Sequence, residues 1–294
     1  MIVAALLIPL ILISIFFSVV LARACLAAGA TRPRLEALAM SAVANFFDTL
    51  GIGSFATTMA WMRVRRLVPD RLIPSTLVTG YNLPTLLQSG VFLVLLGVKV
   101  DPVLLGGCIA AMIAGGLVGV RLVTRTPVRT VQAVVGAALL IAAGFYALAN
   151  LKLMPAGGTA TGLPPELMAV AIAAHFVLGV LVNFGVGNYA PTLAMLSLFG
   201  MDPRLAFPIM ASSAAFCIAG ASVRLVRHEA ELDLRIVLAM ALGGIPAVLV
   251  AAFAVREMPL DLLRWLVVAV VTYAAITLLY SAFRGTLPVA AAEA

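Results

Sequence analysis

The sequence predicts an all-α polytopic membrane protein built from two inverted-topology repeats. Hydrophobic residues make up 64% of the chain, charged residues only 11%, and the mean hydropathy is +1.17. A soluble domain of this composition would have too little polar surface to face water. The chain also has long uncharged runs and a glycine motif that occurs twice.

Seven apolar runs are long enough to cross about 30 Å of hydrocarbon as helices. They contain no Asp, Glu, Lys or Arg, and they span residues 2–21, 72–98, 102–120, 130–151, 205–223, 236–255 and 265–283. Arginines follow the first run but do not precede it. We therefore expect an uncleaved N-terminal transmembrane helix, residues 1–30, with its N-terminus outside the cell.

Two further apolar stretches hold a repeated motif. Gly51 and Gly53 align with Gly185 and Gly187 at an offset of 134 residues, and the alignment continues into the helix that follows. The second stretch has 35 residues between its flanking acids. That length is too great for one crossing and too small for two crossings and a turn. We predict that each stretch forms a re-entrant hairpin of two half-helices.

The distribution of basic residues favours this topology. If both hairpins enter and leave on one side, 14 of the 19 Lys and Arg residues share a face, whereas two full crossings would divide them nine against ten. The five on the other face are Lys99, Lys152, Arg204, Arg256 and Arg264. The positive-inside rule places the larger group in the cytoplasm. We expect a multi-pass protein of the cell inner membrane with a cytoplasmic C-terminus.

Each repeat is then one hairpin followed by three spanning helices, so the second repeat is inverted relative to the first. The predicted units are the N-terminal helix 1–30, a first repeat 35–150, a linker 151–165, a second repeat 166–284 and a tail 285–294.

The two breaks are the predicted site. Irregular backbone persists in hydrocarbon only where protein buries it or a cavity wets it. Glycines allow the turn, and Ser54 and Asn188 are residue types that cap a new half-helix. The N–H groups and positive dipole end of such a half-helix attract anions. Two of these ends, related by a pseudo-two-fold axis near the midplane, would face one small anion.

The candidate substrate-binding residues lie at the breaks and on the helices that follow them. They are Gly51, Gly53, Ser54, Thr57, Thr58, Thr79, Asn183, Gly185, Gly187, Asn188, Tyr189, Thr192 and Ser213. The amides and the tyrosine either donate hydrogen bonds to an oxyanion or repair the broken backbone. The threonines of the half-helices reach either an anion or a carbonyl one turn back. Thr79 and Ser213 line either a hydrated cavity or a helix-packing surface.

Asp48 is the only acidic residue inside an apolar stretch, which makes it the candidate for proton coupling. The alternative is a carboxylate that caps the broken backbone. Val182 occupies the aligned position in the second repeat, so coupling would be asymmetric. His175 is either a satisfied core histidine or a proton relay.

The sequences Gly51-Ile52-Gly53-Ser54 and Gly185-Val186-Gly187-Asn188 share one pattern, a Gly-x-Gly motif followed by a polar residue that opens a helix. Its occurrence twice resembles the sulfite exporter TauE/SafE family of membrane permeases, over residues 35–284. The chain differs from the family's fuller glycine run at Ser54 and Asn188. The resemblance implies transport of sulfite, thiosulfate or organosulfonates such as sulfoacetate, with proton coupling.

Other classes of function find less support. There is no His-Glu-x-x-His motif and no pair of intramembrane carboxylates, and the three cysteines lack metal-ligand spacing, so we expect no enzyme, no cofactor and no metal site. The net charge of +7 indicates orientation and contact with anionic lipid, not nucleic acid. A passive anion channel and a membrane assembly factor without a small-molecule substrate remain as alternatives, and an oligomer is compatible with the sequence.

Overall fold

The computed structural model describes residues 2–53, 55–123, 127–151, 158–183, 186–227 and 232–284. Within these ranges the chain is helical and has no β-strand. The α-helices are α1 (Ile2–Ala27), α2 (Leu35–Thr49), α3 (Phe55–Val64), α4 (Ile73–Leu95), α5 (Pro102–Val123), α6 (Val128–Asn150), α7 (Pro165–Val182), α8 (Tyr189–Leu198), α9 (Ala206–Arg227), α10 (Leu234–Glu257) and α11 (Leu260–Arg284). Short 3-10 helices are η1 (Asp70–Leu72), η2 (Gly97–Lys99) and η3 (Pro203–Leu205).

The predicted all-α polytopic class is confirmed. Among the described residues, seven helices are long and apolar enough to cross a membrane, namely α1, α5, α6, α7, α9, α10 and α11. The set differs from the expected one because α4 is missing and α7 is included. α4 has 23 residues and no charge, but its Ser, Thr, Asn and Gln side chains lower its hydropathy. α7 has 18 residues, about 27 Å of helix, so this first arm of the second hairpin is longer than a half-crossing.

The helix boundaries follow the offsets found in the sequence. α3 and α8 have ten residues each, and both their first and their last residues are 134 positions apart. α5 and α10 begin 132 positions apart, as do α6 and α11. The repeated motif therefore belongs to a repeated order of helices, with α1 outside it.

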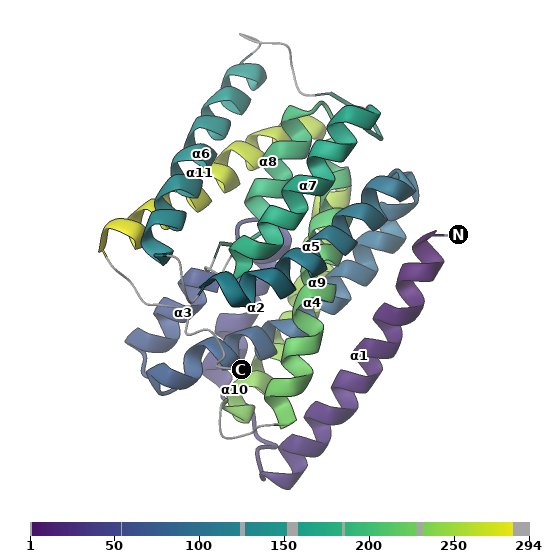
Figure 1. Ribbon diagram of the computed structural model, residues 1–294. Helices are drawn as coiled ribbons and strands as arrows, with labels where there is room; N and C mark the ends of the chain where they lie inside the picture. Colours follow the sequence, from purple (N-terminus) through teal and green to yellow (C-terminus); the bar gives the residue numbers. More distant parts are fainter. Residues whose placement is uncertain are drawn as a thin grey trace.

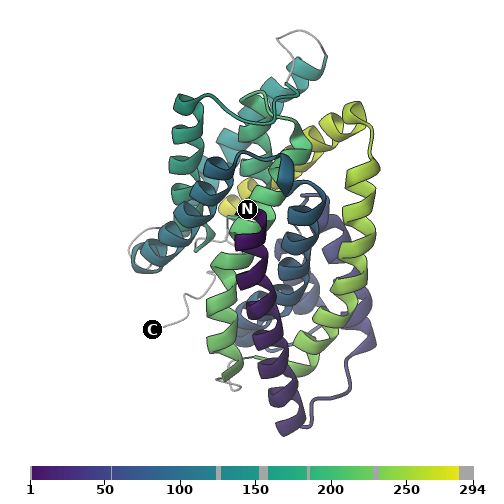
Figure 2. The ribbon, with the colours of Figure 1, turned by 90° about the vertical axis from the view of Figure 1, so that its right-hand side faces the viewer.

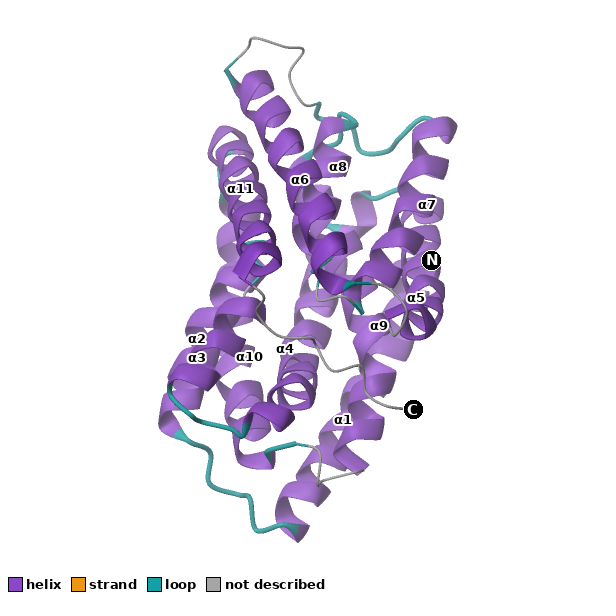
Figure 3. Cartoon of the chain, turned by 60° about the vertical axis from the view of Figure 1, so that its left-hand side comes forward, coloured by secondary structure: helices purple, strands orange, loops and turns teal. Residues whose placement is uncertain are grey.

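α4 and α9, which occupy equivalent places in the two predicted repeats, run antiparallel. The Ser89 hydroxyl on α4 donates to the Ser212 hydroxyl on α9 at 2.9 Å, and the Ser222 hydroxyl of α9 contacts the Val78 carbonyl at 3.4 Å. These two bonds join opposite ends of the helices. In addition, α2 packs on α10 and α7 packs on α5, so the first arm of each hairpin lies on a spanning helix of the other repeat. Figure 3 places α2 and α3 in the lower half and α7 and α8 in the upper half.

The first hairpin, α2 with α3, has its entry and exit side by side. The Arg34 guanidinium donates to the Leu67 carbonyl at 3.0 Å, and Arg65 Nε lies 2.6 Å from Glu36 Oε1. These residues flank the two ends of the hairpin. The chain thus returns to the side from which it came.

The second hairpin, α7 with α8, closes through backbone instead. Ala160 pairs with Met201 in an isolated bridge, in which the Ala160 N–H donates to the Gly200 carbonyl at 3.2 Å and the Asp202 N–H donates to the Ala160 carbonyl at 3.0 Å. Adjacent entry and exit are what a re-entrant hairpin requires. The position of the bilayer around both hairpins stays a prediction.

Glycines bring the hairpin arms against their spanning helices. A Cβ atom at Gly115 of α5 would lie 1.9 Å from the Phe176 carbonyl oxygen of α7, and one at Gly243 of α10 would lie 2.3 Å from the Leu38 carbonyl oxygen of α2. Small residues of this kind permit close helix packing in lipid.

α1 lies along one side of the helix assembly (Figures 1 and 2), packed on α4, α9 and α10. Its outer surface carries exposed apolar side chains, including Ile8, Leu12 and Leu26. Such a surface is typical of a helix that faces lipid.

Candidate substrate site

The first break is a helix C-terminal turn that requires glycine. The Ile52 N–H donates to the Phe47 carbonyl at 3.1 Å and the Gly51 N–H donates to the Asp48 carbonyl at 2.8 Å. This pair of bonds is the Schellman motif, and Gly51 occupies its left-handed position with φ of +93°. The glycine therefore ends α2 while satisfying two of its carbonyl groups.

The tip of the first hairpin reaches the second repeat. A Cβ atom at Gly51 would lie 3.4 Å from Leu193 of α8 and 3.8 Å from Met210 of α9. The first break therefore contacts helices of the other repeat, as a shared site requires.

At the second break, two amide side chains bond to neighbouring backbone. Asn183 Nδ2 donates to the Gly116 carbonyl of α5 at 3.2 Å, and Asn188 Nδ2 donates to the Met210 carbonyl of α9 at 3.0 Å. Asn183 also donates to the Gly179 and Val180 carbonyls at the end of α7, as the repair interpretation expects, whereas Asn188 bonds to an unbroken helix. Asn188 does occupy the N-cap position of α8, but the predicted capping bond is wrong because its amide reaches α9 instead. The first turn of α8 consequently has no side-chain cap.

Side chains from the first turns of both second half-helices reach one face of α4. The Thr58 hydroxyl of α3 lies 2.7 Å from the Tyr81 hydroxyl, and the Phe55 ring stacks on Tyr81 at 5.5 Å between centroids. The Tyr189 hydroxyl, on the first residue of α8, donates to Gln88 Oε1 at 3.2 Å. Tyr81 and Gln88 are seven residues apart, which puts them on the same face about 10 Å from each other.

We call Tyr81, Thr85 and Gln88 the α4 stripe. Gln88 is 1% exposed, and its Nε2 has no hydrogen-bond partner among the described residues, while its Oε1 accepts from Tyr189. An unpaired buried donor is costly and needs an explanation. Gln88 is not among the site residues that the sequence predicts. The seven-residue spacing from Tyr81 is the signal that could have found it.

Asp48 lies in the last turn of α2, three residues before Gly51. Its side chain is half-buried. The candidate for proton coupling therefore stands directly before the first break.

The second glycine of each motif faces open space. Gly53 and Gly187 are both exposed, and a Cβ atom at either would meet nothing within 4 Å. Gly53 has φ of +66°, whereas Gly187 has no positive φ. The two glycines thus have similar surroundings but different backbone conformations.

The structure separates other predicted residues from the α4 stripe. Thr79 is two positions from Tyr81 and so points to another face of α4. Ser213 follows the serine that bonds to Ser89, about 15 Å along α4 from Thr79. Both are buried hydroxyls without a partner among the described residues, yet they do not form one wall. Thr57 is exposed on α3, and Ser54 and Gly185 lie outside the described residues.

His175 is a satisfied core histidine by its contacts. Its Nδ1 lies 2.8 Å from the Ala171 carbonyl oxygen, so this nitrogen carries the hydrogen. Its Nε2 then accepts from the Thr192 hydroxyl at 3.3 Å. The imidazole joins α7 to α8 within the second hairpin.

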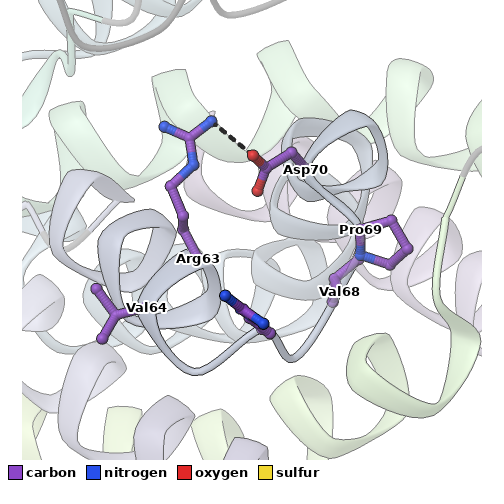
Figure 4. Close-up of a pocket in the computed structure, with 6 residues that line it drawn as sticks. Arg63, Val64, Val68, Pro69 and Asp70 are labelled. Atoms are coloured by element: carbon purple, nitrogen blue, oxygen red, sulfur yellow. Dashed lines mark ion pairs between the residues drawn. The ribbon is translucent and has the colours of Figure 1, made fainter.

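A hollow of about 650 Å³ opens at the far end of α3 (Figure 4). Its lining is Arg63, Val64, Arg66, Val68, Pro69 and Asp70. The Arg63 guanidinium points to Asp70 and lies 3.1 Å from its carboxylate, which neutralises it. Because α3 is about 15 Å long, this hollow is distinct from the region around the α4 stripe. It lies at the predicted cytoplasmic mouth.

Comparison of the chain with protein-family models, with curated proteins and with solved structures gives no match. Fold and site define the class as a polytopic membrane protein in which two broken hairpins meet on the α4 stripe. The resemblance to the sulfite exporter TauE/SafE family stays a prediction from the motif.

Proposed function

We propose that the protein is a secondary transporter of small anions, of the sulfite or organosulfonate type, coupled to protons. The substrate binds between the two helix breaks, beside the α4 stripe. The observation that carries this proposal is that the first turns of both half-helices bond through side chains to one face of α4, where the Nε2 of Gln88 has no partner among the described residues.

Electrostatics supports an anion at this place. Each helix N-terminus carries about half a positive charge and N–H groups that lack intrahelical acceptors. α8 has no side-chain cap to occupy these groups. An anion held by dipoles and neutral donors can also leave, because no ion pair must be broken.

The antiparallel packing of α4 and α9 supports a carrier over a channel. When equivalent helices run in opposite directions, an exchange of conformation between the two repeats opens the same site to the opposite side. The bonds between Ser89 and Ser212 and between Ser222 and Val78 lie in the α4–α9 contact that would have to adjust.

Proton coupling follows from Asp48. An ionised carboxylate at the first break repels an anion bound between the two breaks, and protonation removes the repulsion. Loading of the anion would then favour uptake of a proton.

The test uses the full chain in liposomes. Purified protein is first screened for thermal stabilisation by sulfite, thiosulfate, sulfoacetate, taurine, sulfate and chloride, and then assayed for flux after a pH jump. Saturable flux that follows the proton gradient supports the proposal. Flux that never saturates and ignores the gradient points to a channel. No stabilisation by any anion favours an assembly factor.

A further inference from the structure

The region around the α4 stripe is built almost entirely from neutral groups. The buried polar side chains of the described residues are Ser, Thr, Asn and Gln with one histidine, and they include no Asp, Glu, Lys or Arg. His175, the histidine, bonds to the Ala171 carbonyl and to the Thr192 hydroxyl. Asp48, at the first break, is half-buried and carries a negative charge when ionised.

The positive charge that the helix ends offer to a bound anion is small and fixed in position. Two half-helix N-termini contribute about half a charge each, together about one. Gln88 adds a neutral donor. Its amide oxygen accepts from the hydroxyl of Tyr189, the first residue of α8, and its Nε2 is buried without a partner among the described residues.

We propose that the site selects singly charged oxyanions over doubly charged ones. The desolvation penalty of an ion grows with the square of its charge, whereas its attraction to fixed dipoles grows only in proportion to the charge. A second negative charge would also meet greater repulsion from Asp48. This inference rests on the proposed function and narrows its substrates to anions such as hydrogensulfite and simple sulfonates, with sulfate and thiosulfate disfavoured.

Gln88 is the specificity-determining residue in this scheme. A neutral amide contributes a hydrogen bond to either class of ion, but it does not supply the extra positive charge that a dianion needs. A lysine at the same place would supply it, and a methionine of similar size would supply neither charge nor donor.

Methanesulfonate and sulfate test the inference directly, because the two ions are tetrahedral and close in size but differ by one charge. Titration of the full-length protein by thermal shift at one pH should give at least tenfold tighter binding for methanesulfonate. Equal binding, or tighter binding of sulfate, overturns the selectivity while the proposed anion transport stands. Stabilisation by neither ion overturns both.

Matched variants locate the selectivity. Gln88→Lys should raise the affinity for sulfate relative to methanesulfonate by about tenfold or more, whereas Gln132→Lys, at the other glutamine of the chain, on α6, should leave the ratio unchanged. Gln88→Met should weaken both ions similarly. It introduces no charge, so it keeps the role of Gln88 testable if the lysine variant does not fold. An unchanged ratio in folded Gln88→Lys, or unchanged affinity in Gln88→Met, overturns the role of Gln88.

Discussion

The two hairpins share their geometry and differ in what holds it. In the first, Thr58 of α3 bonds to Tyr81 of α4, a helix outside the hairpin. In the second, the equivalent Thr192 of α8 bonds to His175 of α7, the other arm of the same hairpin. Ten-residue half-helices at the same offset thus keep their places through different partners. The repeat preserves where a half-helix begins, and each half supplies its own hydrogen bonds.

A second difference lies at the ends of the first arms. Asp48 and Thr49 end α2, while Val182 and Asn183 occupy the aligned positions at the end of α7. Asn183 bonds to the backbone of α5. A titratable group is therefore present at one break and absent from the aligned position of the other, although the two breaks meet. This asymmetry makes the two hairpins separable by experiment.

The largest expected effect comes from filling the open space at both breaks. Gly53→Leu and Gly187→Leu should each abolish anion binding while the protein still inserts, because the new side chain occupies space that faces the half-helix ends. Loss of ligand-induced thermal stabilisation measures this. Gly144→Leu on α6, also without a neighbour within 4 Å of a Cβ atom, is the control and should bind normally.

Alanine at Gly53 and at Gly187 compares the backbone strain at the two breaks. Gly53→Ala should cost about 1–2 kcal/mol of stability because a side chain is forced into the left-handed region, whereas Gly187→Ala should not. Retained transport in either leucine variant would remove the breaks from the site.

Asp48→Asn should have the next largest effect. It keeps the size of the side chain and removes its charge, so transport should lose its dependence on the proton gradient more than its affinity for the anion. Flux under a pH jump, compared with binding at fixed pH, separates the two. Val182→Asp is the mirrored change: it should add a second titrating group at the other break. Unaltered gradient dependence in Asp48→Asn would exclude Asp48 as the coupling residue.

Much of the fold was predictable because its signals are local or periodic. Uncharged runs marked most helices, and a constant offset between Gly51 and Gly185 located both breaks. The site was predictable only in part. Tyr189 and Gln88 are 101 residues apart in the chain, so no local pattern connects them. Likewise, Asn188 is a residue type that caps helices, but its Nδ2 donates to a carbonyl on α9 and its side chain does not cap α8.

Removing one hydrogen bond of the half-helix in each hairpin should lower the unfolding free energy moderately and by a similar amount. Thr58→Val leaves the Tyr81 hydroxyl without this partner, and Thr192→Val does the same to His175 Nε2. Each loss should cost about 1–3 kcal/mol of unfolding free energy, because a buried polar group loses its bond. Thermal unfolding in detergent measures both. If only one variant loses stability, the two contacts are not equivalent in the energetics of the repeats.

The smallest expected effect concerns how the hairpins close. Arg65 holds the pKa of Glu36 below its usual range through a hydrogen bond, so their pair supports the first hairpin at neutral pH and is lost as the pH falls through that lowered pKa. The backbone bridge between Ala160 and Met201 does not titrate. Acidification should therefore increase hydrogen exchange slightly at residues 35–38 and not at 200–202, and Glu36→Gln should abolish the difference. An exposed pair of this kind contributes little to stability, so exchange is a better measure than unfolding. Equal responses at both hairpins would mean that side-chain and backbone closure are equally strong.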